Sequence, residues 1–130
     1  MKTIRQTYQI KASPERVFKA LTMADEIKVW SGSAASFEAE EGGSYSMWDN
    51  WVKGTVKEIV PDKKLVQTWK PSDWDKQGKE SIVTFELSEK QGKTTVQLEH
   101  TNVPDEQFKS TSDGWNEYYV GAIKEYLENE

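Results

Sequence analysis

The C-terminal segment DGWNEYYVGAIKEYLENE, at positions 113–130, constrains the fold of this chain more than any other stretch. On a helical wheel one broad face gathers its apolar and aromatic residues, which are Trp115, Tyr118, Tyr119, Ala122, Ile123 and Tyr126. Glu117, Lys124 and Glu128 fall on the opposite face. Because the apolar face is wider than a coiled-coil seam, we expect this helix to lie across a β-sheet. The ends of a chain are usually weakly held, so large aromatic residues here suggest that this segment packs over another part of the domain.

The preceding sequence predicts one strand, two short helices and then a series of strands. Alternation over residues 3–11 is typical of a strand. Ser13 is a good N-cap and Pro14 suits the first helical position, and a second short helix is expected from Ala24 to Trp30. Further strands are predicted near residues 35–40, 43–49, 51–60, 64–71, 80–88 and 94–103. The segment NVPDEQFKSTSDG is expected to link the last strand to the final helix.

This order predicts an α+β fold. Short turns between consecutive strands make neighbouring strands antiparallel. We therefore expect a curved antiparallel sheet of six or seven strands wrapped around the long C-terminal helix, with the two short helices at one end. Gly54, inside a predicted strand, indicates a bulge or a close backbone approach that lets the sheet bend. The length of 130 residues, without a repeat or linker, predicts a single domain, 1–130.

Composition excludes several classes of function. The net charge is −5, and the longest run of basic residues is the pair Lys63-Lys64, so a nucleic acid or an anionic membrane is not an expected partner. Without cysteine there is no disulfide, zinc ribbon or thiol nucleophile. The sequence shows neither a signal peptide nor a stretch of the ~20 apolar residues that span a membrane. We expect a soluble, cytoplasmic protein.

His100 is the only histidine. It is in phase with Val96 and Leu98, so we expect it to face inward near the end of its strand. Its ordinary pKa suits a general base or a hydrogen-bond donor to a ligand; the alternative is a partly buried histidine bonded to a backbone group. A nucleophilic triad is not supported, because the sequence has no cysteine and no Gly-x-Ser-x-Gly motif.

Metal binding has no better support. The sequence has no His/Cys pair, and its clustered carboxylates lack the calcium-loop pattern. We expect these carboxylates to be solvated surface: Glu38, Glu40, Glu41, Asp73 and Asp75. We therefore predict no metal and no cofactor.

The aromatic residues carry the sharpest prediction. We expect a cavity between the sheet and the final helix that holds a small hydrophobic or aromatic molecule. The predicted ligand-binding residues are Tyr45, Met47, Trp69, His100, Trp115, Tyr118, Tyr119 and Tyr126. The alternative is a filled aromatic core. Trp48, Trp51 and Trp74 lie in or near turns, where they mark a contact surface or the mouth of the cavity unless they pack across strands.

Four stretches, SPERVFKALT, EEGGSY, GTVKEIVPDKKLVQTW and DGWNEYYVGAIKEYLE, cover much of the chain. They resemble the stand-alone domains similar to the C-terminal domain of the activator of the heat-shock protein 90 ATPase. The most specific parts are Gly-Trp-x-x-Tyr-Tyr at 114–119 and the block from Gly54 to Trp69. That family belongs to the START-like (SRPBCC) superfamily, and the resemblance implies its helix-grip fold, shared with the birch pollen allergen.

The resemblance implies two kinds of partner. One is a small hydrophobic molecule in the cavity; the alternative is a heat-shock protein 90 type chaperone bound near Trp48, Trp51 and Trp74. The eukaryotic activator has a separate N-terminal domain that binds the middle of its chaperone. We expect no counterpart of that domain here. The family features that we most expect this chain to share are therefore the fold and the cavity.

A cyclase-type enzyme using His100 or a tyrosine as acid or base is a second alternative. Because no catalytic constellation is visible, we expect binding rather than catalysis. The sequence leaves open whether the protein is a monomer or a homodimer.

Overall fold

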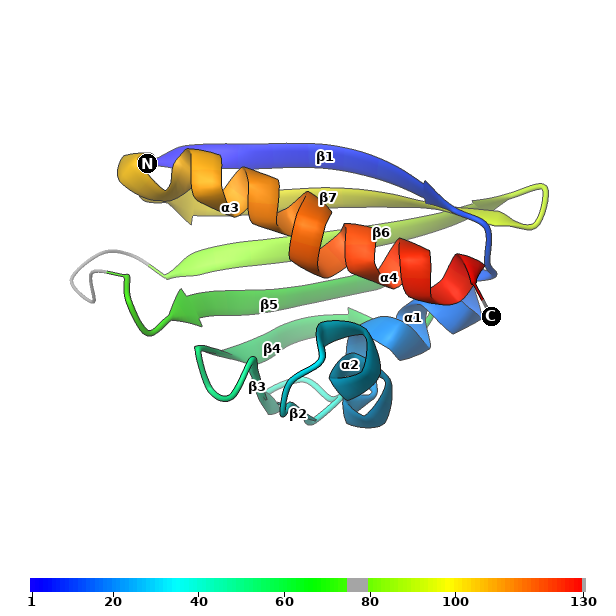
Figure 1. Cartoon of the computed structure of the whole chain (residues 1–130), viewed down its shortest axis with the longest axis horizontal. Helices are drawn as coiled ribbons and strands as arrows, with labels where there is room; N and C mark the ends of the chain where they lie inside the picture. Colours follow the sequence, from blue (N-terminus) through cyan, green and yellow to red (C-terminus); the bar gives the residue numbers. More distant parts are fainter. Residues whose placement is uncertain (75–79, 130) are drawn as a thin grey trace.

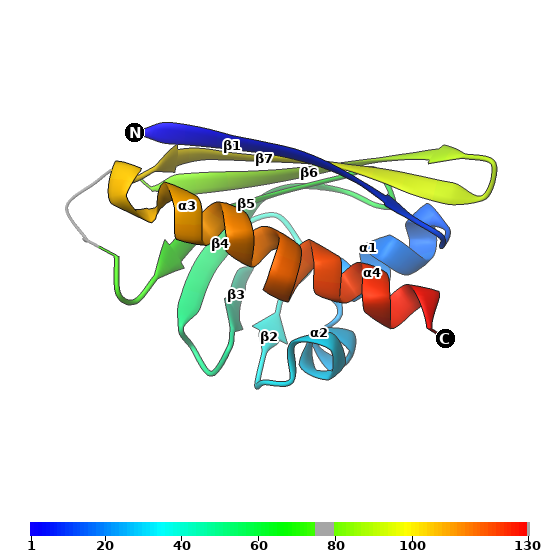
Figure 2. The same cartoon turned by 45° about the horizontal axis from the view of Figure 1, so that its top comes forward.

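In the described part of the chain, seven strands form one antiparallel sheet in the order β1-β7-β6-β5-β4-β3-β2. The computed structural model describes residues 1–74 and 80–129. The strands are β1 (Lys2–Ile10), β2 (Ser36–Phe37), β3 (Ser44–Met47), β4 (Val52–Val60), β5 (Lys64–Pro71), β6 (Ser81–Lys90) and β7 (Lys93–Val103). The sheet curls so that β3 and β4 bend towards the helical side (Figure 2).

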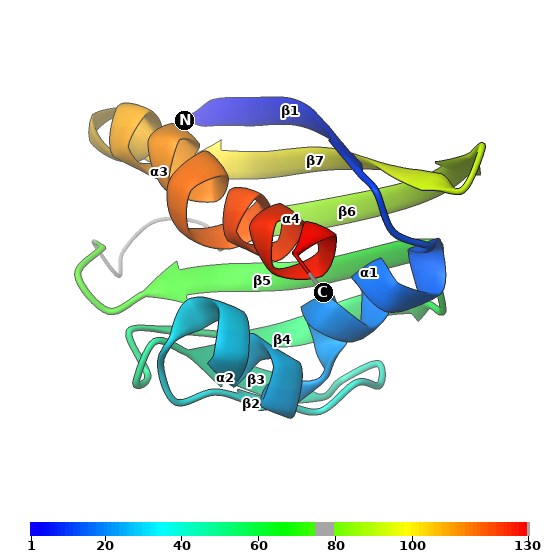
Figure 3. The same ribbon diagram turned by 45° about the vertical axis from the view of Figure 1, so that its right-hand side comes forward.

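The helices cover the concave face of the sheet (Figure 1). They are α1 (Pro14–Thr22), α2 (Ala24–Ser31), the 3₁₀ turn η1 (Asp105–Gln107), α3 (Phe108–Gly114), the π-helical turn η2 (Trp115–Tyr119) and α4 (Val120–Glu128). The last three follow one another as one long segment that crosses the sheet, and α1 and α2 pack beside its C-terminal end (Figure 3). Within the described residues, no helix combines the length and the apolar character that crossing a membrane requires.

The predicted α+β fold and element order are confirmed, and the sheet has the larger of the two expected strand numbers. Ser13 caps α1 as predicted, because its Oγ accepts the backbone N–H of Arg16 at 3.2 Å. The expectation of one domain over 1–130 stays a prediction. Asp75 and the middle of the loop around it lie outside the described residues.

Two predicted elements differ most from the structure. The strand expected at 35–40 is only Ser36–Phe37, because Glu38 leaves the sheet and its carboxylate accepts hydrogen bonds from the Ser44 backbone N–H and hydroxyl. The segment expected to be a link is helical from Asp105 onward. Asp105 and Glu106 lie in its first turn, where negative charge favours a helix N-terminus.

Gly54 allows the close backbone approach that its position predicted. A Cβ at this residue would lie 2.3 Å from the carbonyl oxygen of Thr68 and 2.6 Å from the ring of Tyr45. The Tyr45 ring lies over Gly54 from the neighbouring strand, and the Tyr45 hydroxyl donates to that same Thr68 carbonyl. The register of β4 against β5 shifts between Val56 and Glu58, which adds a bulge next to this point.

The π-helical turn η2 changes which residues the final helix buries. The N–H of Val120 donates to the carbonyl of Trp115, five residues back, so one more residue is accommodated than in an α-helical turn. The inward position expected for Tyr118 was wrong, since its side chain is 64% exposed. A wheel with uniform 100° steps cannot anticipate this change of phase. Beyond the turn the buried residues are Val120, Ile123 and Leu127, while Ala122 and Tyr126 are half-buried.

Gly121 makes the π-helical turn possible, which gives a stability prediction. A Cβ at Gly121 would lie 1.7 Å from the carbonyl oxygen of Asn116. We expect Gly121→Ala to lower the free energy of unfolding by roughly 2–3 kcal/mol, measured by urea unfolding.

Gly114 in the same segment is the matched control. The nearest atom to a Cβ there is 4.0 Å away, so Gly114→Ala should stabilise the helix by about 0.5–1 kcal/mol. Equal stabilisation by both substitutions would contradict this role of Gly121.

Candidate functional site

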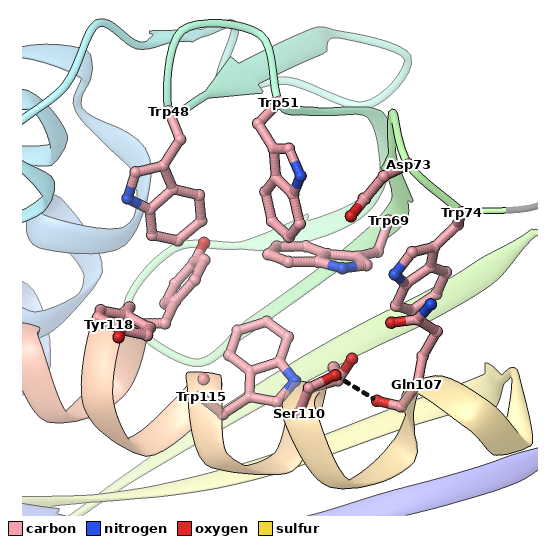
Figure 4. A pocket seen from close by; sticks show the side chains of 12 residues that line it. Trp48, Trp51, Trp69, Asp73, Trp74, Gln107, Ser110, Trp115 and Tyr118 are labelled. Carbon is pink, nitrogen blue, oxygen red and sulfur yellow. Dashed lines mark hydrogen bonds between the residues drawn. The ribbon is translucent and has the colours of Figure 1, made fainter.

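An aromatic pocket of about 480 Å³ lies between the N-terminal half of the long helical segment and two loops of the sheet (Figure 4). Its residues come from the β3–β4 turn, the end of β5 with the loop after it, and the helices η1, α3 and η2. They are Trp48, Trp51, Trp69, Asp73, Trp74, Gln107, Ser110, Thr111, Gly114, Trp115, Tyr118 and Tyr119. Its size is ordinary for a site that holds a small molecule.

Trp69 is the centre of the aromatic cluster and is 5% exposed. Its ring centroid lies 4.8 Å from that of Trp115 and 5.8 Å from that of Tyr119, so the sheet and the helix meet through tilted rings. Trp48 and Trp51 each lie 6.4 Å from Trp69 and stand nearly perpendicular to it. Such edge-to-face pairs contribute about 0.5–1.5 kcal/mol each beyond the area they bury.

The turn that presents Trp48 and Trp51 is conformationally costly. Trp48, Asp49 and Asn50 have φ angles of 50°, 55° and 71°. These angles lie in the left-handed region of backbone conformation, which residues other than glycine adopt less often. For Trp48 this conformation costs roughly 1–2 kcal/mol, whereas Asp and Asn adopt it more readily. Asp49 holds the turn, because its N–H donates to the Ala34 carbonyl and its Oδ1 accepts the Ala34 N–H. Backbone strain of this kind is concentrated at binding and active sites.

His100 lies beneath the pocket, fully buried, and has one defined protonation state. The indole Nε1–H of Trp115 donates to His100 Nδ1 at 3.1 Å, so the imidazole hydrogen is on Nε2. Burial lowers the pKa of His100 to about 3, and the imidazole is therefore neutral at neutral pH. The backbone-bonded alternative for His100 was wrong, since its partner is an indole.

Several buried polar groups around this cluster have no hydrogen-bond partner among the described residues. They are the Gln67 amide, the Trp69 indole N–H, His100 Nε2 and the Tyr119 hydroxyl. Burial also raises the pKa of the Tyr119 hydroxyl above its ordinary value, an effect that the nearby Gln67 amide opposes in part. Unpaired buried groups each cost on the order of 1–3 kcal/mol, and such departures from optimal stability are expected at functional sites.

The structure brings four of the eight predicted site residues to the pocket wall. Trp69, Trp115, Tyr118 and Tyr119 line it, with Tyr118 at the exposed rim. His100 contacts Trp69 and Trp115 from below without lining the pocket.

The other three lie elsewhere. Tyr45 and Met47 are buried in the core, Tyr45 beside Gly54 and Met47 opposite Val52, and the pocket lining includes neither. The Tyr126 hydroxyl donates to Glu26 at 3.2 Å, and Glu26 also pairs with Arg16, so Tyr126 ties α4 to the two short helices. A ligand-binding role for these three stays a prediction without support from their position.

Other lining residues were missed or assigned differently from the sequence. Trp48, Trp51 and Trp74 line the pocket, and this agrees with the cavity-mouth interpretation of the turns that carry them. Gln107, Ser110 and Thr111 were missed because their segment was taken as a link. The signal that could have found them is Pro104 followed by two acidic residues, a pattern typical of a helix start.

The sequence profile of the family described as "Activator of Hsp90 ATPase homolog 1-like protein" matches residues 11–128. The chain belongs to this family. It is 32% identical, over 95% of its length, to the "Activator of 90 kDa heat shock protein ATPase homolog" of Dictyostelium discoideum. It spans about a third of the length of the curated relatives that it matches, 32% of the Dictyostelium protein and 36% of a human one.

Solved structures agree with the assignment. A crystal structure of an HSP90 activator from Plasmodium falciparum superposes with a TM-score of 0.91 at 28% identity, over 98% of this chain and 97% of that one. The solution structure of the Aha1 dimer from Colwellia psychrerythraea matches with a TM-score of 0.85, over 98% of this chain and 97% of that one. At 22% identity the second likeness shows the fold alone. The START-like helix-grip fold implied by the sequence is thus confirmed.

The buried neutral imidazole makes stability depend on pH. Its pKa is about 3 in the folded protein and about 6.5 when exposed, so the unfolded chain binds an extra proton between these values. Stability contributed by His100 is therefore lost as the pH falls from about 6.5 towards 3. Between pH 7 and pH 5 we expect a loss of about 1–2 kcal/mol in the free energy of unfolding, measured by urea titration.

His100→Gln is the reference for this prediction, because glutamine does not titrate and its amide oxygen can accept the Trp115 N–H. The variant should be less stable at pH 7 but should lose less stability than the natural protein on acidification to pH 5. The same pH dependence in both proteins would show that His100 is not held neutral by burial.

Proposed function

We propose that this protein is a non-catalytic binding domain whose aromatic pocket holds a small, mostly apolar or aromatic molecule. The observation that carries the proposal is the pocket itself, in which seven of the twelve lining residues are Trp or Tyr. Apolar surface of this kind supplies affinity at about 25 cal/mol per Å² buried. Polar side chains at the rim, such as Gln107 and Ser110, set orientation.

The geometry does not favour catalysis by His100. A general base works best with a pKa near the working pH and within hydrogen-bond reach of the substrate. His100 has a pKa of about 3 and does not line the pocket. Of the two tyrosines that line the pocket, Tyr119 has a raised pKa and a buried hydroxyl, and Tyr118 lies at the exposed rim. A cytoplasmic location remains our expectation for such a domain.

Substitutions at the rim test the pocket without disturbing the core. Trp51 is 39% exposed and Tyr118 is 64% exposed, so Trp51→Ala and Tyr118→Ala should fold. We expect each to weaken the binding of 2-naphthol, a neutral aromatic probe, by roughly tenfold, through the loss of an aromatic contact. Ligand-observed NMR and tryptophan fluorescence measure the affinity.

Val29, which is 64% exposed and lies on α2, offers the matched control. Val29→Ala should leave the affinity for 2-naphthol unchanged. If neither 2-naphthol nor a panel of phenols, lipids and polyketide-like compounds bound at millimolar concentration, the pocket would have no small-molecule role.

A second candidate function is binding to a heat-shock protein 90 type chaperone. It is favoured by the Plasmodium HSP90 activator, because that structure and this chain match over nearly their whole lengths. The exposed aromatic rim formed by Trp51 and Tyr118 is the contact surface that we propose for such a partner. A homodimer is a further possible assembly, by analogy with the Colwellia protein.

Association with the chaperone of the same organism separates the two candidates. If the second holds, the protein should bind the chaperone below about 100 µM and change its ATPase rate. Trp51→Ala should then weaken this association while Val29→Ala does not. No association at that concentration would remove the chaperone candidate and leave the small-molecule proposal standing.

A further inference from the structure

Three tryptophan rings of the pocket are nearly perpendicular to one another. Trp48 and Trp51 make an angle of 76°, Trp51 and Trp69 one of 80°, and Trp48 and Trp69 one of 78°. Figure 4 shows these rings around one space, with Trp74 and Trp115 at its other sides. The face of each ring carries the negative part of its quadrupole, and tryptophan has the strongest attraction for cations among the aromatic side chains.

Asp73 is the one formally charged side chain among the twelve lining residues that the structure describes. Its carboxylate lies between the rings of Trp51 and Trp74 (Figure 4). No ion pair joins Asp73 to another residue in the described ranges 1–74 and 80–129. The pocket therefore combines aromatic faces with a negative charge at its edge.

Positive charge is missing from the described lining, which contains neither Lys nor Arg nor His. The one histidine below it, His100, is held neutral by burial. An anionic ligand would meet Asp73 without a basic partner, whereas a cation gains from Asp73 and from the net charge of −5.

We propose that this pocket selects small quaternary ammonium compounds, of which choline is the simplest probe, over neutral molecules of the same shape. The inference rests on the binding pocket proposed above and names its class of ligand. A fully alkylated ammonium has no N–H group, so it loses no hydrogen bonds when it enters a space walled by rings. Its methyl groups make apolar contact while its charge attracts the ring faces.

Choline and its neutral isostere 3,3-dimethylbutan-1-ol test the proposal on the full chain. The two molecules have the same shape and differ in the charge of one central atom. We expect choline to bind at least tenfold more tightly, with shifts of the Trp48, Trp51, Trp69 and Trp74 indole signals in ¹H–¹⁵N NMR spectra.

Asp73→Asn should weaken choline binding by roughly three- to tenfold without changing the affinity for the isostere. Glu125→Gln removes one exposed charge from α4, outside the pocket, and should change neither affinity.

Equal affinity for the two molecules, or preference for the isostere, would overturn the inference. The proposed function would survive that result if 2-naphthol still bound to the pocket. Choline binding that left the four indole signals unshifted would also overturn the inference, because it would place the cation elsewhere. If choline, the isostere and 2-naphthol all failed to bind at millimolar concentration, the inference and the small-molecule proposal would fall together.

Discussion

The contact of Trp69 in the sheet with Trp115 and Tyr119 in the final helix is the interaction on which the rest of the structure depends. It joins the central strand β5 to the terminal segment, which no strand pairing holds. Large rings bury 150–250 Å² each, so a few of them add substantially to a core whose other buried residues are mostly Ile, Leu and Val. The Trp115–His100 hydrogen bond fixes the ring orientation at the same place. Core and pocket therefore share one aromatic cluster.

One aromatic cluster contributes both to core packing and to the pocket. This explains several features in this part of the molecule that cost folding free energy. Three consecutive left-handed residues shape the turn at Trp48, a π-helical turn interrupts the helix at Trp115, and buried polar groups stay unpaired beside it. None of these features improves stability. All of them lie at or beside the aromatic pocket.

The fold was largely predictable because its causes are local and repeat along the chain. Alternating strands, the Ser13-Pro14 helix start and the close approach at Gly54 each leave a signature in a few residues. The site was only partly predictable, because it depends on long-range register and on helix phase. A uniform wheel placed Tyr118 inward; the π-helical turn turns it outward. Asp73 could be assigned to surface from sequence, but its position between two tryptophan rings depends on how two distant loops meet.

Ending the chain at Ser112 tests most directly whether the terminal aromatic segment completes the core. This removes Trp115 and Tyr119 with the rest of η2 and α4, and it leaves all seven described strands in place. Urea unfolding of the shortened chain, followed by far-UV circular dichroism, is the measurement. The account predicts no cooperative transition, because the concave face would lie open to water. A shortened chain that unfolds cooperatively at a urea midpoint close to that of the full chain would contradict it.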